Sequence, residues 1–130
     1  MITGIYAGLC GLLMLVLAWR VVRVRKREKI GLGDGGHPEL QRATRAHANF
    51  TEYVPLALVM MLAFETSGGP AALTHAFGAT LLIGRVLHAQ GLGSSSGYSK
   101  GRFYGTLATW AVVAGLAVAL VGRGVWGWVG

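Results

Sequence analysis

Apolar residues in this chain gather in long stretches that are separated by short segments rich in glycine, proline or charge. No charged residue occurs between Met1 and Trp19, which is close to the roughly 20 residues needed to cross a hydrocarbon layer. The segment 31–38 and the turn Ser67–Pro70 carry the glycine and proline signals that break helices. The pattern predicts one domain of four membrane-spanning helices over about 2–22, 39–65, 71–91 and 102–122.

The order of charge around the first stretch favours an uncleaved spanning helix over a signal peptide. A signal peptide carries basic residues before its apolar part, whereas here the basic run 20–29 follows it. Basic residues also lie after the third stretch, at Lys100 and Arg102, and the turn Ser67–Pro70 has none. By the positive-inside rule, both basic segments are cytoplasmic and both termini face the other side.

Composition supports a membrane protein and excludes several other classes. Of the 130 residues, 53% are hydrophobic and 13% are charged; soluble domains have about 25% charged residues. Disordered chains are poor in apolar residues, so disorder is excluded. The single Cys10 excludes an internal disulfide, and no histidine pair has the spacing of a metal site. The net charge of +7 fits contact with lipid headgroups better than nucleic-acid binding, because no aromatic residues are interleaved with the basic run.

The second helix carries a polar strip that a lipid-facing surface would not tolerate. Arg42, Arg45, Asn49, Glu52 and Tyr53 fall within an arc of about 100°. Ionisable groups at such depth normally face a bundle interior or an aqueous cavity. One alternative is an internal ion pair of Glu52. The strip has more arginines than carboxylates, however, and the surplus charge predicts an anionic ligand such as a carboxylate.

The third and fourth helices add further polar residues at the same level. Arg85 and His88 are three residues apart and share one helix face, and Arg102 opens the fourth helix. Two alternatives remain: Arg85 extends to the interface, and His88 bonds to a neighbouring backbone. Small-residue spacings at Gly4, Gly8 and Gly11 and at Ala111, Gly115 and Ala119 predict close helix approach.

The segment Arg45–Pro55, with the pattern R-A-x-x-N-x-x-E-Y-x-P, resembles the second-helix motif of the MAPEG family, the membrane-associated proteins of eicosanoid and glutathione metabolism. Gly84–His88 resembles the third helix of that family, and Arg102 falls where the family places an arginine. The four spans extend the similarity over nearly the whole chain, and the short form is most similar to the bacterial branch.

The resemblance implies an all-α, integral membrane four-helix bundle that assembles as a homotrimer in a bacterial inner membrane. Glutathione would bind between protomers as co-substrate, at a site that faces the cytoplasm. Arg102 would stabilise its thiolate. The residues expected to bind the thiol peptide are Arg42, Arg45, Asn49, Glu52, Tyr53, Arg85 and His88. The sequence departs from the family at Leu92 and Phe103, where some members carry hydroxyl groups; Tyr98 and Tyr104 are candidate substitutes.

The leading interpretation is a glutathione-dependent transferase or peroxidase. It would activate the thiol as thiolate for attack on a lipophilic electrophile or hydroperoxide. A small four-helix multidrug transporter is an alternative, but such transporters place an essential acidic residue within the first apolar helix, and 2–22 has none. A non-catalytic membrane protein that keeps a vestigial thiol site is the other alternative.

Overall fold

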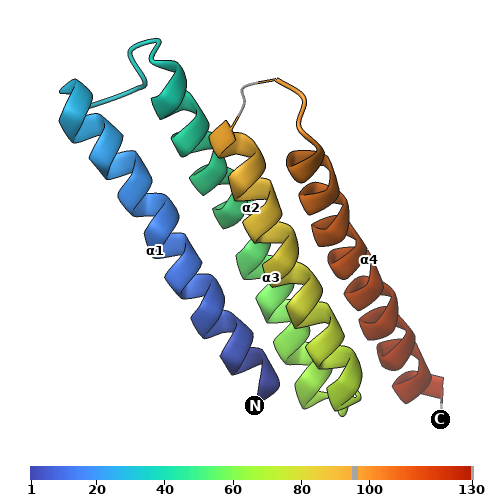
Figure 1. Cartoon of the computed structure of the whole chain (residues 1–130). Helices are drawn as coiled ribbons and strands as arrows, with labels where there is room; N and C mark the ends of the chain where they lie inside the picture. The colour runs from blue at the N-terminus through green and yellow to red at the C-terminus, as the bar shows by residue number, and fades with distance from the viewer. Residues whose placement is uncertain (95–96, 130) are drawn as a thin grey trace.

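The computed structural model describes residues 1–94 and 97–129, with side chains described up to residue 127. These residues form four α-helices joined by short connections (Figure 1). The chain runs alternately up and down, so the start of α1 and the end of α4 lie at the same end of the bundle. The helices are α1 (Ile2–Glu28), α2 (Pro38–Thr66), α3 (Ala71–Ser94) and α4 (Lys100–Val129).

Each helix contains its predicted stretch, but α1 continues six residues beyond the expected end at residue 22, to Glu28. The added part is the basic run, because arginine and lysine are good helix formers and charge alone does not end a helix. The helix ends where Lys29 adopts a left-handed conformation, with φ 55°, and donates its backbone N–H to the Arg25 carbonyl. The third helix also continues beyond its expected end at residue 91, because α3 includes Ser94; residues 95–96 lie outside the described part.

The two central helices are α2 and α3, and α1 and α4 flank them without touching each other in the described residues (Figure 1). Two apolar clusters fill the interior. One lies toward the end with the α1–α2 connection and includes Cys10, Leu17, Phe50, Val54 and Leu92. The other lies toward the opposite end and includes Met61, Phe64, Leu81, Val112 and Leu116. The interior of the single chain is therefore closed by side chains from all four helices.

The closest helix approach is between α3 and α4, at glycines that the sequence patterns did not single out. A methyl group at Gly105 would lie 2.4 Å from the carbonyl oxygen of Gly84 and 2.7 Å from the backbone nitrogen of His88. The prediction for the first helix is wrong for contacts within the chain, because a methyl group at Gly4, Gly8 or Gly11 would meet nothing within 4 Å. Small residues matter where two backbones meet, and only the three-dimensional packing shows where that is.

A carboxylate ties the start of α1 to the end of α2. The Glu65 side chain accepts hydrogen bonds from the backbone nitrogens of Ile2 and Thr3, at 2.6 and 2.8 Å. These are helix N-terminal donors without partners inside the helix, and negative charge is favourable there. At the same end, the Tyr6 hydroxyl lies 3.2 Å from Nδ1 of His75.

Two of the helices are long and apolar enough to cross a membrane, within the residues that the structure describes. They are Ile2–Glu28 and Lys100–Gly127. The outward faces of these two helices carry exposed apolar side chains such as Leu12, Trp19, Trp110 and Val118. Membrane crossing by α2 and α3, which carry more polar residues, stays a prediction, as does the side on which the termini lie.

Candidate functional site

A cavity of about 230 Å³ lies where the first turns of α2 meet the last turns of α3 and the first turn of α4. It brings together residues from three helices that are far apart in the sequence. Five of the residues predicted to bind a ligand line it: Arg42, Arg45, Asn49, His88 and Arg102. Pro38, Gln41 and Leu92 complete the lining.

The electrostatics of this cavity are strongly positive. Three guanidinium groups line it, and no carboxylate from the described residues does. None of the three arginines forms an ion pair in the described part of the chain. Guanidinium groups donate in a planar fork that matches carboxylates. The cavity is therefore suited to an anion that carries carboxylate groups.

The start of α4 positions Arg102. Ser99 precedes the helix, and its hydroxyl accepts a hydrogen bond from the Arg102 backbone nitrogen at 3.2 Å. This is an N-cap arrangement, which fixes where the helix begins. The Arg102 side chain donates to the Gly97 carbonyl oxygen at 2.9 Å and is half-buried. A cationic side chain and the positive end of a helix dipole therefore lie on the same side of the cavity.

Arg85 does not line the cavity; it lies buried behind it. Its side chain is only 2% exposed, so it does not extend to the interface. One guanidinium nitrogen donates to the Asn49 side-chain oxygen at 2.7 Å, and another donates to the Gly105 carbonyl at 3.2 Å. The guanidinium carbon lies 6.0 Å from the centre of the Tyr53 ring. Arg85 thus links α3 to α2 and α4 and orients the Asn49 amide that lines the cavity.

The outer part of the polar strip on α2 is exposed to the surroundings in the single chain. Glu52 and Arg45 are both exposed, whereas Asn49 and Tyr53 are half-buried against the rest of the bundle. The two exposed residues form no ion pair with each other. Glu52 lies one turn beyond Asn49, outside the cavity lining. The strip therefore continues from the cavity onto the surface of the chain.

The MAPEG family profile matches residues 3–122 of this sequence. The chain belongs to the MAPEG family. It is also similar to the inner membrane protein YecN of Escherichia coli K12, with 37% identity over 119 residues. That match covers 92% of this chain and 89% of the relative, and the protein of the same name from E. coli O6:H1 matches equally. The apolar helices and this similarity make the chain an integral membrane protein.

In this MAPEG chain, three residues that line the cavity were not predicted as site residues: Pro38, Gln41 and Leu92. Gln41 precedes Arg45 by one helical turn, so the strip could have been extended to include it. Leu92, which the sequence analysis noted only as a departure from the resembled family, lines the cavity with an apolar side chain. Neither Tyr98 nor Tyr104 lines the cavity of the single chain, and both are exposed. The cavity therefore has no phenol of its own.

Proposed function

We propose that this MAPEG protein is a glutathione-dependent transferase or peroxidase. The observation that carries the proposal is the cavity lined by three arginines and no described carboxylate. Glutathione has two carboxylates, which suit Arg42 and Arg45, and an amide-rich backbone, which suits Asn49. The residues present thus fit the thiol peptide in charge and in hydrogen-bonding type.

The open edge of the strip supports a site shared between copies of the chain. Arg45 and Glu52 would face hydrocarbon in a monomer, at a high energetic cost. A second copy packed over this edge would remove that cost and would enclose the peptide. Glu52 would then be available for the ammonium group of glutathione. We propose three copies, a number that the family resemblance supports, and a site on the cytoplasmic side, which the positions of the basic residues support.

Arg102 is the residue that we propose stabilises the glutathione thiolate. A nearby cation favours the thiolate over the thiol, whose ordinary pKa is about 8.5. The thiolate attacks an electrophilic carbon of a lipophilic substrate, a thioether forms, and the leaving group departs with the bond electrons. With a hydroperoxide, the thiolate attacks oxygen and releases an alkoxide that takes up a proton. A second thiol then converts the sulfenic acid to a disulfide and water.

Two substitutions test the binding site. Arg45→Ala and Glu52→Gln should each weaken glutathione binding by about 2–5 kcal/mol, the scale for truncating one partner of a buried charged pair. Isothermal titration of the purified oligomer measures this. Lys26→Gln is the matched control, because Lys26 is an exposed cation outside the cavity lining. Unchanged affinity in both site variants would contradict the proposal. Tight binding without conjugation or peroxide reduction would favour a non-catalytic protein instead.

A further inference from the structure

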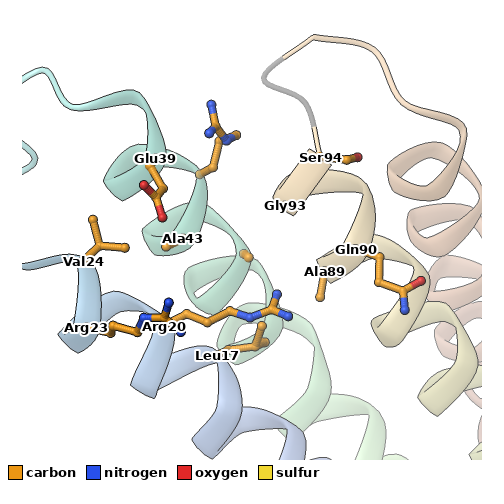
Figure 2. A pocket seen from close by; sticks show the side chains of 12 residues that line it. Leu17, Arg20, Arg23, Val24, Glu39, Ala43, Ala89, Gln90, Gly93 and Ser94 are labelled. Carbon is orange, nitrogen blue, oxygen red and sulfur yellow. The ribbon is translucent and has the colours of Figure 1, made fainter.

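A second and larger cavity, of about 490 Å³, lies between α1, α2 and α3 (Figure 2). The cavity proposed for glutathione lies between α2, α3 and α4, on the opposite side of the first turns of α2. Arg42 lines both cavities. Figure 2 shows Arg20 and Arg23 extending from α1, with Ala89 and Gly93 on the opposite side on α3. The basic run was interpreted from sequence as a topology signal, and the structure gives part of it a specific location.

The charge of this cavity is not balanced. Arg20, Arg23 and Arg42 line it, and Glu39 is the only carboxylate among its described lining residues. Glu39 is already engaged, because its side chain accepts a hydrogen bond from the Arg27 guanidinium. The three lining arginines form no ion pair with any residue that the structure describes. The cavity thus presents unpaired cationic donors that suit an anionic ligand.

The three arginines lie above an apolar floor. Leu17, Ala46 and Ala89 line the cavity and belong to the buried cluster beneath it. Arg20 follows directly after the uncharged stretch that ends at Trp19. The boundary between apolar and charged residues therefore coincides with the cavity, which is the depth at which phosphate headgroups lie.

The outer face of α1 continues the site into the hydrocarbon layer. Val16 precedes Arg20 by one helical turn and Arg23 by two, so it lies on the same face. Leu12 and Leu9 follow further along this face, and all three side chains are exposed, at 50%, 63% and 41%. An acyl chain could lie along them while its headgroup occupied the cavity.

We infer that this cavity binds the phosphate headgroup of an anionic phospholipid, with Arg20, Arg23 and Arg42 as its donors. Arg20 reaches across the cavity, since its terminal nitrogen lies 3.9 Å from where a methyl group on Gly93 would be. A bound phosphate would therefore connect α1 to α2 and α3. This site shares Arg42 with the cavity proposed for glutathione, but its α1 residues Arg20 and Arg23 line this cavity alone, and the inference does not depend on the proposed enzymatic function.

The test is lipid binding by the intact protein, measured by native mass spectrometry and by thermal unfolding in mixed micelles. Phosphatidylglycerol should be retained and should raise the melting temperature, whereas phosphatidylcholine should do neither. The double variant Arg20→Gln/Arg23→Gln should bind phosphatidylglycerol at least roughly tenfold more weakly, since each charge-assisted hydrogen bond contributes about a factor of ten. The control Lys26→Gln/Lys29→Asn removes the same charge outside the cavity lining and should bind like the wild type.

A cavity-filling variant and two soluble phosphate probes provide further tests of lipid binding. Ala43→Phe should fill the cavity while leaving every arginine in place, and it should weaken lipid binding even if the arginine variant folds poorly. Inorganic phosphate and glycerol phosphate serve as soluble probes. If they stabilise the protein as strongly as the lipid, the ligand is a soluble phosphate and the lipid assignment is overturned. Equal lipid binding by the arginine variant and its lysine control would also overturn it.

Discussion

At the scale of single residues, the most informative side chain is Arg85. The sequence placed it on a polar face of the third helix and left open whether it extended to the interface. The structure shows it buried, with bonds to Asn49 and to the Gly105 carbonyl. This outcome could not be predicted, because both partners lie on other helices. Its remaining guanidinium nitrogen, Nε, has no partner among the described residues.

The Arg85–Asn49 contact can be measured by a double-mutant cycle. Arg85→Met and Asn49→Ala should each destabilise the protein, because each leaves a buried polar group without its partner. Their combined effect should fall short of the sum by about 1.5–3 kcal/mol, the range for a hydrogen bond to a charged group. Chemical unfolding in detergent gives the three values. Additive effects would show that the contact contributes nothing to stability.

At the scale of helices, the sequence predicted all four elements, because uncharged stretches and glycine- or proline-rich breaks are local signals. The sequence did not predict which residues of different helices contact each other. The Glu65 carboxylate that accepts bonds at the start of α1 is one example, since its partners are more than 60 residues away. The α3–α4 approach at Gly105 is another, because the small-residue spacing on the fourth helix included Gly115, which packs against Phe77, but did not include Gly105.

The close approach of α3 and α4 gives a prediction for Gly105. Gly105→Ala should destabilise the protein by about 1–3 kcal/mol, the usual cost of overpacking, because the added methyl group collides with backbone atoms of α3. It should also weaken glutathione binding, since the shift displaces Arg102 relative to His88. Thermal unfolding and titration measure the two effects.

Gly122→Ala is the matched control on the same helix. A methyl group there meets nothing within 4 Å, so its stability should be unchanged or slightly higher. Equal stability of the two variants would contradict the packing described for Gly105.

At the scale of the whole molecule, the site residues divide into two groups. The cavity is lined by predicted site residues that the sequence pattern placed at one level: Arg42, Arg45, Asn49, His88 and Arg102. Glu52 is exposed outside the cavity in a single chain, and no pattern within one sequence could reveal what covers it. The shared site that we propose therefore requires a second copy of the chain to cover this residue.

The mass of the oligomer can be measured directly. Light scattering or native mass spectrometry in mild detergent should give three times the protomer mass of 13.7 kDa. Glu52→Leu should leave this mass unchanged if the interface is mainly apolar, while thiol binding falls. A purely monomeric protein that still binds glutathione would contradict the shared site.

One titration decides whether Arg102 holds a bound thiol as thiolate. Thiolate absorbance is followed against pH with glutathione bound to the wild type and to Arg102→Leu. We expect a midpoint well below about 8.5 in the wild type and a clearly higher midpoint in the variant, with a smaller change in glutathione affinity. If Arg102 only anchors α4 at the membrane surface, insertion or stability would suffer while the thiol pKa stayed the same. Identical midpoints in the two proteins would contradict the role assigned to Arg102.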